Sequence, residues 1–175
     1  LARQGYPVTR LGFVASIDDA LQQILQVGAL TDTLDQATAL TTRLQTGMRA
    51  SQTRLQPVLA GHTAIFFSNN GVVYGSGTLQ DSFLHSLGMH NVAADAGLTG
   101  PGQLALETVV AAAPDFIFSH PGATLDQQLA HPLLMHPVWL QLAPASRRIP
   151  LQDTWFDCAG PRLLRAYQAL EEALL

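Results

Sequence analysis

The sequence has a single cysteine and few basic residues. Cys158 is the one thiol, which excludes an intrachain disulfide and leaves the cellular compartment open. Lys and Arg together number 9 against 13 Asp and Glu, and their densest cluster is the pair Arg147 and Arg148. The net charge of -4, with so little basic clustering, argues against a nucleic-acid surface and against a polybasic membrane contact. We therefore expect no nucleic-acid partner.

Long apolar runs and the common catalytic motifs are also absent. Glu107, Pro114 and Asp115 interrupt the best apolar stretch, well short of the ~20 residues that cross a bilayer. The sequence contains no Gly-x-Ser-x-Gly elbow, Gly-rich phosphate loop or GxGxxG fingerprint, and no base can be assigned to Cys158. We expect no catalytic residues. The opening "LARQGYPVTR" has no initiator Met and no leader pattern, which favours a fragment of a longer protein.

The residues that are present predict alternating strands and helices. A strand is expected at "YPVTRLGF", followed by a helix that Ser16 starts and Gly28 closes. From Thr31 to Pro57 the apolar spacing keeps one helix face, which fits either a core helix or a rigid connector between two lobes. Strands then alternate with helices, and the expected strands are "TAIFFS", "VVYGSG", "DFIFS" and "SRRIPL". Thr78 can cap the first helix among them. This order predicts an α/β fold with a mainly parallel sheet covered on both faces.

The histidines do not have the spacing of a metal site. His131 and His136 are five residues apart and each precedes a proline, so they do not share a regular helix face. His85 and His90 flank the end of one helix, where a cation favours the helix dipole. His120 is better placed, because it follows "DFIFS" and open α/β sheets bind ligands beyond the carboxyl ends of their strands. An ordinary loop histidine is the alternative, and we expect no resident metal.

Two stretches place aromatic and small polar residues where a strand ends and a helix begins. They are "VVYGSGT" and "DTWFDCAG". A ring beside glycine suits a flat organic ligand, although such aromatics also serve as anchors between loop and core. We expect both stretches to form a cleft-facing surface at one edge of the sheet. With His120, the candidate ligand-binding residues are Tyr74, Gly75, Ser76, Thr78, His120, Thr154, Trp155, Phe156 and Cys158.

Several phrases, taken in order, resemble the class III periplasmic binding proteins, which are the substrate-binding proteins of ABC importers for iron siderophores, haem and cobalamin. The most specific are LG-x-x-N at 87–91, a Glu followed seven residues later by Pro-Asp and a strand, and Gly-Pro-Arg before the last helix. In that family one long helix joins two α/β lobes. The resemblance implies that 1–14 is the last strand of a mostly absent N-terminal lobe. It also implies that 15–57 holds linker helices, including the interlobe helix, and that 58–175 is a Rossmann-like C-terminal ligand-binding lobe.

The resemblance also implies a function. It implies a non-enzymatic protein, periplasmic or lipid-anchored at the outer face of the cytoplasmic membrane, that delivers a metal chelate to a permease. A ferric siderophore is expected first, with haem or cobalamin next. Thr154 and Cys158 stand where cobalamin binders present charged residues, and Tyr74 and His120 are the candidate iron ligands if the chelate is haem. The alternatives are a chelatase-like enzyme on a related two-lobe fold and an interaction module that binds no ligand.

Glu107 lies in an apolar run with no basic residue within four positions. In the family, a glutamate on the surface of each lobe docks into a basic pocket of the permease, so the resemblance implies this role for Glu107. A solvated glutamate on an amphipathic helix is the alternative.

A lobe without its neighbour also leaves apolar surface and an unpaired strand facing water, so we expect the chain to self-associate as a dimer.

Overall fold

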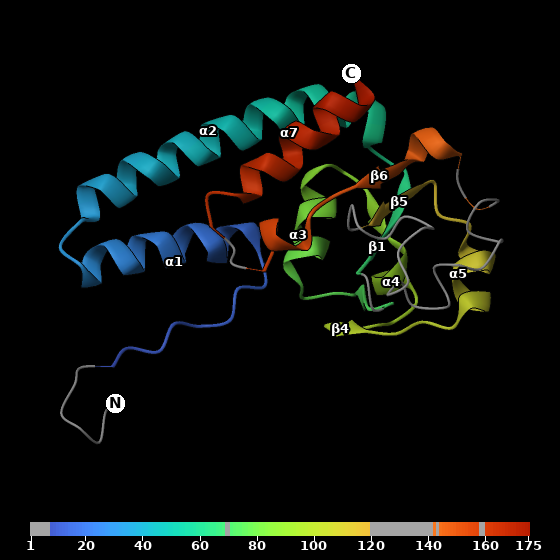
Figure 1. Cartoon of the computed structure of the whole chain (residues 1–175), viewed down its shortest axis with the longest axis horizontal. Coiled ribbons are helices and arrows are strands. Elements are labelled where there is room, and N and C mark those ends of the chain that lie inside the picture. The colour runs from blue at the N-terminus through green and yellow to red at the C-terminus, as the bar shows by residue number, and fades with distance from the viewer. Residues whose placement is uncertain (1–7, 69–70, 120–141, 143, 158–159) are drawn as a thin grey trace.

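The computed structural model describes residues 8–68, 71–119, 142, 144–157 and 160–175. Two helices that lie side by side, α1 (Ile17–Leu30) and α2 (Leu34–Leu59), precede an α/β lobe (Figure 1). The lobe contains β1 (Thr63–Phe67), β2 (Val73–Tyr74), α3 (Leu79–Ser86), β3 (His90–Asn91), α4 (Val92–Asp95), β4 (Pro101–Gly102), α5 (Leu106–Ala112), β5 (Phe116–Ser119), η3 (Ala145–Arg147), β6 (Arg148–Pro150), η4 (Asp153–Trp155) and α7 (Leu163–Leu174).

Helix α1 begins where the sequence predicts and ends later. The Ser16 hydroxyl accepts a hydrogen bond from the Asp19 amide at 3.0 Å, which caps the helix. Gly28 does not close it, because α1 continues to Leu30. Gly28 instead lies against α2, where an added Cβ would overlap that of Ala37. The glycine therefore serves the close packing of two helices, and the chain reverses at Asp32, which has a φ of 54°.

Helix α2 includes Pro57, where the sequence predicted its end. The proline lies in the last turn, so the helix loses one backbone hydrogen bond there and extends to Leu59. Leu55 and Leu59 are fully buried on either side of it, and their burial offsets the loss. The Ala60 amide then closes the helix on the Gln56 carbonyl at 2.9 Å.

The strand expected near the start does not form in residues 8–15. This segment pairs with no strand in the described part of the chain. Its hydrogen bonds are with α1: the Gly12 carbonyl accepts from Gln23 Nε2 at 3.0 Å, and the Ala15 amide donates to Asp19 Oδ2 at 3.1 Å. A β-strand requires a partner backbone, and none of the described strands lies alongside. The assignment of 1–14 to another lobe stays a prediction.

The sheet is mainly parallel, as predicted. Its order is β4-β2-β1-β5-β6, with β3 beside β1 off this path. Strands β3, β5 and β6 are parallel to their neighbours, whereas β2 is antiparallel to both β1 and β4. Phe67 pairs with Ser119, and Ser119 pairs with Pro150, so the carboxyl ends of β1, β5 and β6 meet at one edge. Ligands of open α/β sheets bind beyond such an edge.

Both faces of the sheet are buried. One face, with Phe66 and Phe118, packs against α2, α3 and α7. The other face, with Ile65, packs against α4 through Val92 and against α5 through Val109. Because different helices cover the two faces, the sheet is enclosed as the sequence predicts.

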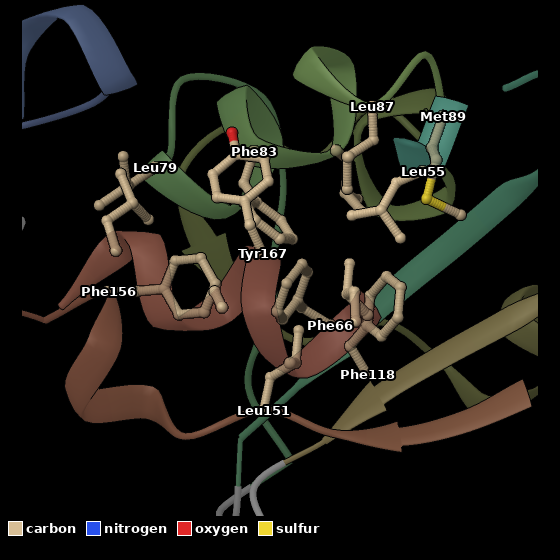
Figure 2. Packing of buried hydrophobic residues seen from close by; sticks show 14 of the residues in the cluster. Leu55, Phe66, Leu79, Phe83, Leu87, Met89, Phe118, Leu151, Phe156 and Tyr167 are labelled. Atoms are coloured by element: carbon tan, nitrogen blue, oxygen red, sulfur yellow. The ribbon is translucent and has the colours of Figure 1, made fainter. Parts of the chain in front are cut away.

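Aromatic side chains fill the larger core (Figure 2). The ring of Phe83 lies 4.7 Å from that of Tyr167, 5.3 Å from Phe156 and 6.1 Å from Phe66. The buried Tyr167 hydroxyl lies 2.6 Å from Ser86 Oγ and accepts from Gln52 Nε2 at 3.2 Å. Burial raises the pKa of Tyr167, so the hydroxyl stays protonated and ties α7 to α2 and α3.

Asp115 joins the amino ends of β1 and β5. Its Oδ2 accepts from the amide of Thr63 at 3.0 Å and from the Thr63 hydroxyl at 3.1 Å. The backbone hydrogen bond from Thr63 is the main cause that lowers the pKa of Asp115. This carboxylate therefore has a structural role at the edge of the sheet opposite to the carboxyl ends.

Candidate functional site

A hollow of about 350 Å³ lies where the segment before α1 meets the β2–α3 connection and η4. Its walls come from parts of the chain that are distant in sequence. The lining residues are Gly12, Phe13, Val14, Gln23, Tyr74, Thr78, Leu79, Gln80, Pro101, Phe156 and Asp157. Aromatic and aliphatic side chains occur there beside two amides, two hydroxyls and one carboxylate, a mixture that is typical of sites for amphipathic organic ligands.

The connection from β2 to α3 passes very close to Leu98. The Gly75 amide donates to the Gly100 carbonyl at 2.9 Å, and the Ser76 amide donates to the Leu98 carbonyl at 2.9 Å. A Cβ added at Gly75 would overlap the Leu98 backbone. Glycine is therefore required at position 75 so that two backbone segments can approach each other.

Thr78 caps α3, as the sequence predicts. Its hydroxyl donates to the Gly75 carbonyl at 2.7 Å and accepts from the Asp81 amide at 3.2 Å. Asp81 Oδ1 in turn accepts from the side-chain amide of Asn91 at 2.8 Å. The Thr78 hydroxyl is thus engaged within the loop, and its part in the hollow is to hold the surrounding backbone in place.

Tyr74 stands half-buried at the side of the hollow. Burial raises the pKa of its phenol, the carboxylates of Asp153 and Asp157 raise it further, and a hydrogen bond with Ser68 acts in the opposite direction. The side chain is therefore a neutral phenol at pH 7. Without a metal ion beside it, this phenol can both donate and accept a hydrogen bond.

The segment after β6 brings Phe156 to the same hollow. Phe156 is buried, and its ring lies 5.2 Å from Phe66 and 5.3 Å from Phe83. Asp157 follows it at the rim. Trp155 is half-buried against the larger core, and Thr154 is exposed. Packing of the Phe156 ring in the core therefore fixes the position of this side of the hollow.

Three of the nine predicted ligand-binding residues line this hollow: Tyr74, Thr78 and Phe156. Four others, Gly75, Ser76, Thr154 and Trp155, lie in the two predicted stretches without lining it. His120 and Cys158 fall outside the described residues. The assignment of all nine to a ligand stays a prediction.

The sequence interpretation missed Gln80 and Asp157 as lining residues. Asp157 lies within the stretch "DTWFDCAG", whose aromatic rings are its more distinctive feature. Gln80 occupies the first turn of α3, where a polar residue ordinarily faces solvent, so no pattern marked it. It is only 6% exposed. Its position depends on the docking of α3 against distant segments, which local sequence does not encode.

No metal centre is evident in the described residues, which contain no group of three or more His, Cys, Asp or Glu placed to hold an ion. His85 Nδ1 lies 2.9 Å from the Asp81 carbonyl oxygen, and His62 Nδ1 lies 3.2 Å from Asp115 Oδ2. Neither histidine lines the hollow. His131 and His136 lie outside the described residues.

Glu107 is exposed in the first turn of α5. Within the described part of the chain it makes no side-chain hydrogen bond or ion pair. Helix α5 lies on the far side of the lobe from α1 (Figure 1). A carboxylate in the first turn also interacts favourably with the helix dipole, so its exposure needs no internal basic partner. Among the described helices, none is both long and apolar enough to cross a membrane.

The fold defines a Rossmann-like α/β lobe that follows a long helix, and comparison with known families agrees. The family described as "Periplasmic binding protein" matches residues 1–148, so the chain belongs to the periplasmic binding protein family. This confirms the family that the sequence phrases indicated. A comparison with curated proteins finds no match.

Solved structures of similar fold include three bacterial binding proteins. The periplasmic heme-binding protein RhuT from Roseiflexus sp. RS-1 is 25% identical, with a TM-score of 0.75 over 91% of this chain and 63% of that one. The periplasmic heme-binding protein HutB of Vibrio cholerae is 21% identical, with a TM-score of 0.77 over 99% and 69%. The periplasmic vitamin B12-binding protein BtuF of Vibrio cholerae is 15% identical, with a TM-score of 0.75 over 98% and 68%. The chain thus spans roughly two thirds of the length of these proteins.

Proposed function

We propose that the chain is a ligand-binding lobe of the substrate-binding protein of an ABC importer. It acts outside the cytoplasmic membrane, in the periplasm or on a lipid anchor, captures a metal chelate and delivers it to a permease. The observation that carries this proposal is the hollow, which brings Tyr74 and Phe156 together from the two stretches expected to face a ligand. Membership of a binding-protein family supports capture without catalysis.

A ferric siderophore is our first choice of ligand, ahead of haem and cobalamin. Solved structures of similar fold include a heme-binding protein, a vitamin B12-binding protein and a protein of an Fe3+-hydroxamate transport system, which supports the general class of metal chelates. Burial and the nearby carboxylates raise the pKa of Tyr74 and so disfavour the phenolate form that an axial ligand to haem iron adopts. A siderophore needs no protein ligand to its iron, because its own oxygens fill the coordination shell.

A titration of the chain tests chelate capture. We expect dissociation constants in the millimolar range, because one lobe contacts one face of the ligand and each ~1.4 kcal/mol of lost contact is a factor of ten. Tyr74→Ala should weaken binding by about tenfold, since an aromatic contact and a hydrogen bond are lost. Val110→Ala, a change at an exposed site on α5, is the matched control.

The measurement is the shift of amide resonances on adding a ferric siderophore analogue, haem or cobalamin. An unchanged spectrum with all three would contradict chelate capture. Sub-micromolar binding by a monomer would contradict the two-lobe account. A sedimentation run on the same samples tests the expected dimer. The side chain of Phe13 is 82% exposed and provides apolar surface for such a contact.

Permease docking through Glu107 gives a separate prediction. Glu107→Ala should change the free energy of unfolding by less than about 0.5 kcal/mol, as for other exposed positions, while weakening binding to the permease. Glu172→Ala, at an exposed position on α7, is the control and should leave permease binding unchanged. Unfolding curves and co-sedimentation with permease vesicles provide the two readouts. A large loss of stability with Glu107→Ala would instead reveal a structural carboxylate.

A further inference from the structure

Asn91, the last residue of the phrase LG-x-x-N, is almost completely buried, at 1% exposure. Its side-chain nitrogen Nδ2 donates to the backbone carbonyl of Tyr74 at 2.9 Å and to Asp81 Oδ1 at 2.8 Å. Its Oδ1 accepts from the amide of Ala93 at 3.1 Å, which caps α4. A side-chain amide has two N–H groups and one oxygen, so every polar group of this side chain is in use. One buried side chain thus joins β2, α3 and α4.

Strand β2, which ends at Tyr74, has little backbone pairing of its own. It consists of Val73 and Tyr74, and its register with β1 is the single pair Phe67 and Val73. Its other neighbour, β4, is also two residues long. Strands of this length have few ladder hydrogen bonds to fix their ends. The hydrogen bond from Asn91 to the Tyr74 carbonyl therefore adds a constraint that the short ladder does not supply.

Asp81 connects Asn91 to the loop before α3. The residue is 8% exposed, and a buried carboxylate is unfavourable unless donors surround it. Asn91 supplies one donor, and His85 Nδ1 lies 3.4 Å from the same Oδ1. The backbone amide of Asp81 donates to the Thr78 hydroxyl at 3.2 Å. The network therefore holds both ends of the β2–α3 connection, Tyr74 through Asn91 and Thr78 through Asp81.

Neither Asn91 nor Asp81 lines the hollow, whereas Tyr74 and Thr78 do. We propose that Asn91 and Asp81 are positioning residues for ligand capture, which act by fixing where Tyr74 stands in the hollow. The inference rests on the proposed function, since it names residues that arrange the same site. Without the Asn91 donor, two buried acceptors lose their partner, and the end of β2 shifts until water or another group reaches them. The Tyr74 ring moves with its backbone, and its contact with the ligand is lost.

The test starts from Asn91→Asp, which keeps the size of the side chain and the acceptor for the Ala93 amide but removes both donors. It also places a second carboxylate beside Asp81. The probes are three diamagnetic chelates: the gallium complex of desferrioxamine B, gallium protoporphyrin IX and cyanocobalamin. The probe that the unmodified chain binds most tightly should bind about fivefold more weakly to the variant. The Tyr74 ring resonances and the Gly75 amide resonance should shift before any ligand is added.

Asp115→Asn is the matched control, since it weakens a comparable network at the opposite edge of the sheet. It should lower the melting temperature and leave both the probe affinity and the Tyr74 resonances unchanged. If Asn91→Asp behaves in the same way, Asn91 serves folding alone and the inference is overturned.

The exchange of both residues, Asp81→Asn together with Asn91→Asp, separates the two contacts of Asn91 and covers the case in which the single variant does not fold. An amide again faces a carboxylate between the two positions, but an acceptor still faces the Tyr74 carbonyl. The melting temperature should recover most of its loss, while the affinity stays about fivefold low. Full recovery of the affinity would overturn the role of the Tyr74 contact.

These outcomes are distinct from failure of the proposed function. Binding of a probe that Tyr74→Ala and Asn91→Asp both leave unchanged overturns the inference and keeps chelate capture. Failure of all three probes to bind the unmodified chain overturns both.

Discussion

Replacing Phe83 with alanine is expected to lower the free energy of unfolding by about 3–5 kcal/mol, since a large buried ring leaves a cavity that the core fills only partly. Phe83 is fully buried, and three aromatic rings pack around it (Figure 2). For a chain of this size the melting temperature should fall by roughly 10 °C. Chemical denaturation and thermal melts provide the measurements.

Phe13→Ala is the matched control for this prediction. The same ring is removed from a side chain that is 82% exposed, so the change should stay within about 0.5 kcal/mol. Equal effects at the two positions would contradict the core described here. Phe156 packs against Phe83 and lines the hollow, so Phe83→Ala should also loosen that wall and weaken chelate binding.

Gly75→Ala should destabilise the chain by about 1–3 kcal/mol and weaken ligand binding. The added methyl group would overlap the Leu98 backbone, and a backbone segment moves aside less readily than a side chain. The shift should displace Tyr74, which precedes the glycine directly. Unfolding curves and the chelate titration measure the two effects.

Gly12→Ala controls for the chemistry of the substitution. An added Cβ at Gly12 meets nothing within 4 Å, and its φ is not in the left-handed region, so stability should be nearly unchanged. Wild-type stability for Gly75→Ala would mean that Leu98 does not approach as closely as described.

Local patterns predicted the elements whose causes are local. The cap at Thr78 and the long amphipathic helix that precedes β1 follow from neighbouring residues, and both form. The predictions at Gly28 and Pro57 were wrong because tertiary packing altered the expected ends. Gly28 lies inside α1 because α2 packs closely against it there. Helix α2 continues beyond Pro57 because Leu55 and Leu59 are buried in the core.

The sequence by itself determined the α/β class, the parallel sheet and the family. The reason is that apolar periodicity indicates which residues are buried, and short motifs indicate where the chain turns. Only the tertiary structure decided which side chains share the hollow. Gln80, Asp157 and Tyr74 meet there from three segments of the chain, and one of them carries no local mark of its role. Contacts between residues distant in sequence depend on how helices dock on the sheet, and local sequence does not specify that docking.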